Sequence, residues 1–349
     1  MNGCHRVRAA AAIVLIAAVV SLSARAPGVE LIRHDAERRV DVIVDGRPFT
    51  SYIWPDRLRK PVLFPIRTAT GTAVTRGFPL DPRPGERVDH PHQVGLWFNY
   101  GNVNGADFWN NSDAVAPERR GRMGTVVHQS IAGSTGGAEQ GELRTLADWR
   151  MPDGTVVLGQ STTYVFRGTA TERSIDLTIT LTARDVPVSF TDNKEGMLGL
   201  RVARALEAPA DKPEIFTDRD GHPTAAPVLD NAGVNGEYLT SEGARGQAVW
   251  GTRGRWCRLE GRVGEEVVAV AILDHPGNVG FPTYWHARGY GLFAANPLGQ
   301  KELSGGKEVL DFSLAPGRSV TFRYRVIVWS GSAPREQVDA AWRAWSKAP

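Results

Sequence analysis

Short stretches of alternating apolar and polar residues, separated by turns rich in Gly, Pro and Asp, dominate this chain. Residues 175–181 alternate Ile or Leu with polar residues, the period of two typical of a half-buried strand. Asp45-Gly46 lies between two apolar stretches and predicts a tight hairpin, because Asp-Gly readily adopts positive φ. Further strands are expected at residues 156–166, 248–257, 267–273, 291–295, 309–314 and 320–329.

Helical periodicity is clear only near the C-terminus. Val338, Ala341, Trp342 and Trp345 recur at i, i+3, i+4 and i+7, which places them on one face. Many short strands without alternating helices favour an all-β fold, a large antiparallel sandwich with a short C-terminal helix. No composition change marks a linker, so residues 27–349 are expected to form one domain, with loops at 133–141 and 208–235.

The first 26 residues have the pattern of a secretory signal peptide. Arg6 and Arg8 precede an apolar run at residues 9–20, and the small-residue sequence Ala24-Arg25-Ala26 follows. The run is too short to span a bilayer comfortably, and no later stretch is apolar for eighteen residues. We expect a periplasmic or secreted protein that has no membrane partner once the leader is removed.

Cleavage of this leader is directly testable. Mass spectrometry of periplasmic material should find a chain that starts near Pro27, because the small residues before it suit a signal peptidase. Recovery of the intact form starting at Met1 from the cytoplasm would contradict this expectation.

Charge and cysteine content narrow the possible partners. The chain has 41 Lys and Arg against 38 Asp and Glu, and the excess of three lies in Arg6, Arg8 and Arg25. The remainder is neutral and lacks a basic block, which argues against nucleic acid as a partner. After cleavage only Cys257 remains, so the fold must depend on a large core without an intrachain disulfide.

Asp89-His90-Pro91-His92 is the first candidate for chemistry. Residues i and i+2 of an extended segment share a face, and Pro91 favours an extended His90. Two imidazoles on one face can bind a divalent metal, or can supply a proton donor and a proton acceptor near neutral pH. Alternatively, one of them only hydrogen-bonds a buried carbonyl. No other cofactor is expected.

Polar and aromatic residues follow this motif closely. Trp97, Asn104, Asp107 and Trp109 combine donors and acceptors with rings, which suits a sugar that has hydroxyl groups and apolar C–H faces. A series of turns rich in Asn and Gly is the structural alternative.

Glu195-Gly196 and Arg201 form a second candidate. A partly buried Glu195 can act as a general base or acid, and Arg201 can hold a substrate oxygen or keep the carboxylate ionised. A simple surface ion pair between them is the alternative.

A third group of polar residues flanks the end of an apolar strand. His275 follows residues 267–273, and Tyr284 and His286 share a face by the period of two. Polar residues at strand ends commonly assemble sites, so these side chains are expected to join the two earlier histidines.

Taken together, several sequence motifs of this chain resemble those of the DUF6807 family, also labelled methane oxygenase PmoA. The matching strings are Asp89-His90-Pro91-His92 with Gly95-Leu96-Trp97, Glu195-Gly196 with Arg201, Trp250-Gly251 with Arg255-Trp256, Asp274-His275-Pro276, Pro282 to His286, and Asn296-Pro297. The resemblance implies a galactose-mutarotase-like β-supersandwich. In mutarotases of that fold a glutamate is the base and a histidine the acid on a bound sugar, which is similar in kind to Glu195 beside His92 or His286.

The sequence is compatible with three alternative functions. The first is an exported enzyme that uses Glu195 as base, one of His90, His92 and His286 as acid, and Arg201 to orient an oxygen. Its substrate would be a sugar, an oligosaccharide or an oxidised glycoside, and its reaction that of an epimerase, mutarotase, lyase or hydrolase. The second is a metal-dependent carbohydrate enzyme with His90, His92 and either Asp89 or Glu195 as ligands. The third is a glycan-binding module whose Trp97, Trp109 and Trp285 are exposed stacking platforms.

Overall fold

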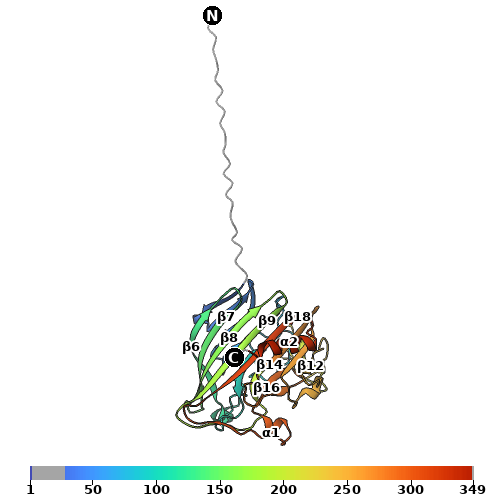
Figure 1. Cartoon of the computed structure of the whole chain (residues 1–349). Helices are drawn as coiled ribbons and strands as arrows, with labels where there is room; N and C mark the ends of the chain where they lie inside the picture. The colour runs from blue at the N-terminus through green and yellow to red at the C-terminus, as the bar shows by residue number, and fades with distance from the viewer. Residues whose placement is uncertain (2–27, 348–349) are drawn as a thin grey trace.

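Two eight-stranded antiparallel sheets form the body of the protein (Figure 1). The computed structural model describes Met1 and residues 28–347, and the rest of the predicted leader lies outside the described residues. The site sheet has the order β1 (Val29–His34), β2 (Arg39–Val44), β3 (Arg47–Ile53), β4 (Val62–Leu63), β5 (Leu96–Tyr100), β11 (Gly196–Arg201), β16 (Leu292–Asn296), β15 (Tyr284–Ala287).

The back sheet is built mainly from longer strands. Its order is β12 (Glu237–Thr240), β13 (Trp256–Val263), β14 (Glu266–Asp274), β18 (Ser319–Ser330), β9 (Glu172–Ala183), β8 (Val156–Gly168), β7 (Gly141–Arg150), β6 (Thr125–Thr135). A small pair, β10 (Val188–Phe190) with β17 (Phe312–Leu314), lies apart from both sheets. Short helical segments are η1 (Asp35–Glu37), η2 (Pro117–Arg122), η3 (Arg204–Leu206), η4 (Gly246–Val249) and α1 (Gln300–Leu303).

Most strands predicted from periodicity are confirmed. The hairpin turn at Asp45-Gly46 has φ of 52° and 73°, as its sequence requires. β8, β9, β14, β16 and β18 cover the expected ranges, and no named strand or helix interrupts residues 208–235.

Three predicted boundaries were wrong. Residues 248–255 form part of η4 and a loop instead of a strand, because Gly251 has φ of 71° and Gly254 packs against the indole of Trp285. The strand expected at 309–314 begins only at Phe312. The expected loop at 133–141 is shorter, since β6 continues to Thr135.

The main core lies between the two sheets. Phe98, Leu198 and Ala295 are neighbours on adjacent strands and all belong to this core. The next position along these strands carries Trp97, Gly199 and Ala294, which must point to the opposite face because side chains alternate. The outer face of the site sheet is therefore separate from the core.

α2 (Arg335–Trp345) covers the outer face of the back sheet, where Figure 1 shows it near β14 and β18. Val338 and Trp345 are buried in a second apolar cluster with Trp256 and Trp329. The predicted C-terminal helix is thus confirmed, and its apolar face packs against the back sheet. Nε1 of the partly buried Trp342 also donates to the Asp274 carbonyl at 2.8 Å.

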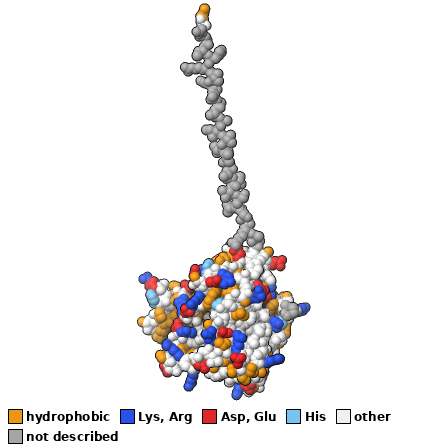
Figure 2. All heavy atoms as spheres, turned by 90° about the vertical axis from the view of Figure 1, so that its left-hand side faces the viewer, with side chains coloured by type: hydrophobic (Ala, Val, Ile, Leu, Met, Phe, Trp, Pro, Cys, Tyr) orange, Lys and Arg blue, Asp and Glu red, His pale blue; other side chains and the backbone are white. Residues whose placement is uncertain are grey.

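The surface carries mixed charge. On the face shown in Figure 2, basic and acidic side chains are interspersed. Within residues 28–347, no helix is both long and apolar enough to cross a membrane.

Candidate functional site

Two small residues, Gly199 and Ala294, lie in the middle of a row across the outer face of the site sheet. His286 pairs with Ala294, Ala294 with Gly199, and Gly199 with Trp97, so the four lie in one row across β15, β16, β11 and β5. A Cβ at Gly199 would come within 2.5 Å of Cζ2 of Trp97, so only glycine lets this indole lie so close to the strand. Trp109 also contacts Gly199, and Trp97, Trp109 and Ala294 belong to one buried apolar cluster, so the row is packed and has His286 and Trp97 at its two ends.

Glu195 and His286 meet at one end of this row. Nδ1 of His286 lies 3.9 Å from Oε2 of Glu195 and 2.9 Å from the Lys194 carbonyl, to which it donates. Burial lowers the pKa of His286 to about 4, although Glu195 opposes the shift. The ring is therefore neutral at pH 7 with its proton on Nδ1, which leaves Nε2 as an acceptor.

Hydrogen bonds fix the backbone that carries Glu195. Its amide donates to Oδ1 of Asn193 at 2.9 Å, and its carbonyl accepts from the amide of Gly101 at 2.7 Å. Nδ2 of Asn296 donates to the carbonyls of Asn193 and Lys194. Nζ of Lys194 lies 3.0 Å from Oε1 of Glu195, so the carboxylate is oriented and remains partly exposed.

Arg201 lies beneath this surface. It is fully buried and donates to Oδ1 of Asp89 at 2.7 Å and Oε1 of Gln93 at 2.6 Å. The expected pair with Glu195 is not formed, because β11 ends at Arg201 beside Asp89. A buried guanidinium with these partners holds the loop at residues 89–93 and does not reach solvent.

Asp89 is the centre of this buried ionic cluster. Burial opposes its ionisation, but Arg201, His90 and Arg76 together hold the pKa of Asp89 well below its usual range. Arg76 is also fully buried and donates to Asp89 and to the carbonyls of residues 87, 90 and 93. The loop with the two histidines is thus anchored by charge-assisted hydrogen bonds.

His90 and His92 come together through a turn. The extended conformation predicted for His90 was wrong: its φ is 40°, and the amide of Gln93 donates to its carbonyl. The two rings are nevertheless 5.6 Å apart and roughly perpendicular. Nδ1 of His90 lies 2.9 Å from Oδ2 of Asp89, and its side chain is 40% exposed.

Tyr290 connects His90 with the Glu195 region. Its ring stacks on His90 at 4.8 Å with nearly parallel planes, and the guanidinium of Arg201 lies 4.9 Å from it. Burial raises the pKa of Tyr290, and the charge of Glu195 acts in the same direction, so the phenol keeps its proton. The sequence prediction missed Tyr290, whose only local signal is a position between Gly289 and Gly291.

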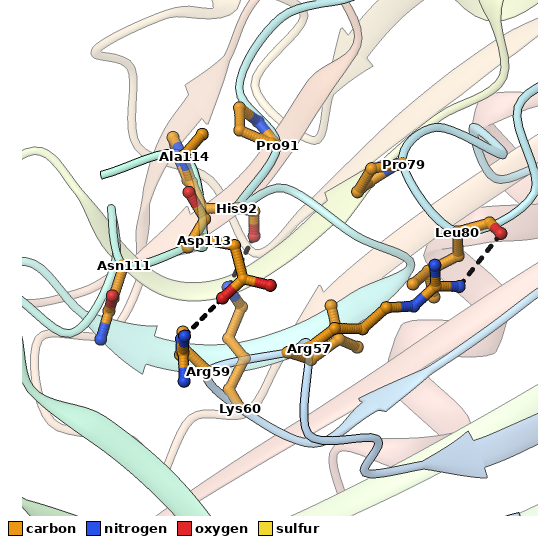
Figure 3. Close-up of a pocket in the computed structure, with 12 residues that line it drawn as sticks. Arg57, Arg59, Lys60, Pro79, Leu80, Pro91, His92, Asn111, Asp113 and Ala114 are labelled. Atoms are coloured by element: carbon orange, nitrogen blue, oxygen red, sulfur yellow. Dashed lines mark hydrogen bonds and ion pairs between the residues drawn. The ribbon is translucent and has the colours of Figure 1, made fainter. Parts of the chain in front are cut away.

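A cavity of about 260 Å³ lies beside His92 (Figure 3). Lys60 and His92 both line it, and Nζ of Lys60 donates to the His92 carbonyl at 2.6 Å. Nζ also lies 5.4 Å from the ring centre of Trp97, so this cavity adjoins the row that begins at His286. The sequence did not indicate Lys60 as a site residue, because this residue is buried by segments that are distant in the sequence.

Other predicted site residues have different places. His275 packs edge-on against Trp345 of α2, on the back sheet, and does not join His286. Asn104 exchanges hydrogen bonds with residues 187 and 189, and Asp107 accepts from the amides of residues 109 and 110, so both hold loops. Tyr284 is buried beside His286 on β15 and stacks under Arg253.

The expected aromatic platforms are not exposed. Trp97 is 2% exposed, and Trp109 and Trp285 are fully buried, so the surface that a stacking module requires is missing at these residues. Among the described residues, no group of three or more His, Cys, Asp and Glu side chains is placed to hold a metal ion. The Asp89 carboxylate, which the metal hypothesis named as a third ligand beside His90 and His92, pairs with Arg76 and Arg201.

Several solved structures of carbohydrate-related proteins align with this chain at low identity. The GH36 α-galactosidase AgaB from Geobacillus stearothermophilus aligns over 87% of this chain and 41% of its own, with 9% identity and a TM-score of 0.41. Galactose 1-epimerase from Lactobacillus acidophilus aligns over 89% and 100%, with 9% identity and a TM-score of 0.35. A putative aldose 1-epimerase from Escherichia coli K12 aligns over 86% and 99%, with 15% identity and a TM-score of 0.31.

The chain thus spans about two fifths of the α-galactosidase chains it matches. No curated protein matches its sequence. The model of a family described as "Family of unknown function (DUF6807)" matches residues 39–343, most of the length of the chain. This protein belongs to the DUF6807 family.

Proposed function

We propose that this protein is an exported carbohydrate-active enzyme that performs acid/base chemistry on a sugar or oxidised glycoside at the outer face of the site sheet. The observation that carries the proposal is the oriented Glu195 carboxylate beside a neutral His286. The leader-like first 26 residues support a periplasmic or secreted location.

Glu195 is the general base in this proposal. Its carboxylate is 19% exposed and held by Lys194, so it can accept a proton from a bound substrate without first reorganising. The side chain of His286 is 2% exposed, and its Nε2 is the acceptor that would position a substrate hydroxyl. A face that combines these acceptors with the donors of Lys194 and Tyr290 suits a sugar, whose hydroxyls both donate and accept.

His90 is the general acid. Burial lowers the pKa of both His92 and His286, so these two rings are neutral and poor proton donors at pH 7. His90 is more exposed, and its ring is oriented by the Asp89 carboxylate, whose Oδ2 lies 2.9 Å from Nδ1. The neighbouring phenol of Tyr290 is a second donor.

These groups are sufficient for two related reactions. Mutarotation or epimerisation requires a proton to be removed from one atom of the sugar and a proton to be returned to another. Elimination from an oxidised glycoside requires the same base to remove the proton α to the carbonyl, together with donors for the enolate oxygen, and it expels the leaving oxygen to form an alkene. Addition of water to this alkene would complete a hydrolysis. Glu195 would take the proton, and His90 or Tyr290 would supply one to the ring or leaving oxygen.

The pH dependence of turnover tests the role of His286. A panel of reducing sugars and glycosides identifies a substrate, and kcat/KM is then measured over the range in which circular dichroism shows a folded protein. We expect kcat/KM to fall as pH decreases through about 4, because His286 then becomes protonated and Nε2 can no longer accept. Glu195, Lys194 and Arg288 are the charges that face this ring.

Carboxylic acids in general also titrate at acidic pH, so variants must isolate the contribution of His286. His286→Gln should lower kcat/KM at neutral pH and flatten the acidic limb, whereas His222→Gln, at an exposed position, should match the wild type. A His286→Gln enzyme with the wild-type rate and profile would exclude the role given to this ring.

A further inference from the structure

The cavity beside His92 has an uncompensated positive charge. Three basic residues, Arg57, Arg59 and Lys60, line it together with one carboxylate, Asp113, which pairs with Arg59 (Figure 3). Among the described residues, Arg57 donates only to the Leu80 carbonyl, at 3.1 Å. An anion is therefore the ligand that the charge of this cavity favours.

Lys60 is the most unusual group in the cavity. It is 4% exposed, and no described carboxylate lies within ion-pair distance of its amine. Burial lowers the pKa of Lys60 to about 7, partly opposed by the charge of Asp107. Buried lysines are normally paired, so a lysine with only one carbonyl partner has capacity for a ligand oxygen.

His92 supplies a second free polar atom. His92 is one of the residues that line the cavity, it is 9% exposed, and its Nε2 has no hydrogen-bond partner among the described residues. A buried polar atom without a partner is costly in free energy, which indicates a partner that binds from outside the chain. The ammonium of Lys60 and an N–H of His92 together match the two oxygens of a carboxylate.

We propose that this cavity binds a carboxylate of the substrate, so that the substrate is a glycan containing a uronic acid. The inference rests on the proposed sugar chemistry at Glu195 and extends it to a substrate class. The walls formed by Leu58, Pro79 and Pro91 are apolar and suit the C–H face of a sugar ring. At about 260 Å³ the cavity holds one sugar unit rather than a whole oligosaccharide.

The spacing of the two regions indicates more than one sugar unit. His286 and Trp97 are separated by three strand spacings, which amounts to about 14 Å between their backbones. Lys60 lies against Trp97, at the far end of this row from Glu195. The carboxylate therefore belongs to a unit next to the one on which Glu195 acts.

Matched ligands test this proposal on the wild-type protein. The probes are disaccharides of galacturonate, glucuronate and mannuronate, their uncharged methyl esters, and the neutral sugars galactobiose and cellobiose. Calorimetry should show at least one acid binding roughly tenfold or more tightly than its ester, the range expected for a hydrogen bond to a charged group. Equal affinity of every acid and its ester would overturn the inference.

The Lys60→Met variant tests whether this cavity causes the preference for acids over their esters. Methionine has a similar volume and carries no charge, so the acid and its ester should bind this variant equally. Lys307→Met removes an exposed lysine and should retain the wild-type preference. The melting temperature of Lys60→Met should be unchanged or higher, because a desolvated amine is removed; a clear decrease together with an unchanged preference for acids would show that Lys60 is structural.

The same panel separates failure of this inference from failure of the proposed function. Neutral sugars that bind and turn over, without any preference for acids, would overturn the uronate assignment alone. If no sugar of either kind binds, both proposals fail. Galactose 6-sulfate is added to the panel as a sulfate probe. A preference for it that depends on Lys60, without one for any uronate, would overturn the carboxylate assignment.

Discussion

Glu195→Gln should lower kcat for a responsive sugar by roughly 10²–10⁴-fold, the usual contribution of a general base. Glutamine keeps the shape of the side chain and its contact with Lys194 but cannot accept a proton at the pH of the reaction. KM should change little, because the loop at 193–196 is held by backbone hydrogen bonds that the substitution leaves intact. Turnover of the substrate found in the sugar panel provides the measurement.

The fold should tolerate this change. Glu195 is partly exposed and its pair with Lys194 is at the surface, so the loss of stability is expected to be about 0–1 kcal/mol. Glu265→Gln, in the exposed turn between β13 and β14, is the matched control and should have wild-type kinetics. A Glu195→Gln protein that turns over at the wild-type rate would remove Glu195 from the mechanism.

Truncation before Val338 should lower the melting temperature clearly. It removes Val338 and Trp345 from the apolar cluster on the back sheet and exposes Trp256 and Trp329 to water. Removing a buried aromatic side chain costs about 3–5 kcal/mol, a large part of the stability of a typical domain. Thermal unfolding followed by circular dichroism gives the measurement.

Single substitutions refine this test. Trp345→Ala should reproduce much of the loss, whereas Trp250→Ala should cost less because Trp250 is 37% exposed. An unchanged melting curve after truncation would mean that the helix does not contribute to the cluster.

The local alternation of apolar and polar residues was sufficient to predict most of the fold, because the fold depends on which face of each strand is apolar. The alternation at 175–181 and the helical stripe at 338–345 correspond directly to β9 and α2. The strand predicted over residues 248–255 was wrong because Gly251 and Gly254 lie close to residues that are distant in the sequence. The alternation of apolar and polar residues does not encode such contacts.

The site was predicted less completely. Glu195 does lie beside His286, and His90 lies beside His92, but Arg201 is fully buried and His275 packs against Trp345 on the other sheet. Sequence spacing fixes orientation only within a strand, so it could not show which strands become neighbours.

Lys60 illustrates the remaining limit. Lys60 has its unusual environment because residues 91–92 and 111–114, which are far away along the chain, line the same cavity. A lysine before an apolar segment normally marks an exposed strand end, and sequence alone gives no reason to place it in a cavity.

The strand order of the back sheet has a consequence for biosynthesis. β18 lies between β14 and β9, so a strand made near the end of synthesis completes the centre of the sheet. Until residues 319–330 leave the ribosome, β9 and β14 present open edges that can pair with other chains. Premature termination anywhere before β18 therefore yields aggregation-prone fragments rather than a smaller folded protein.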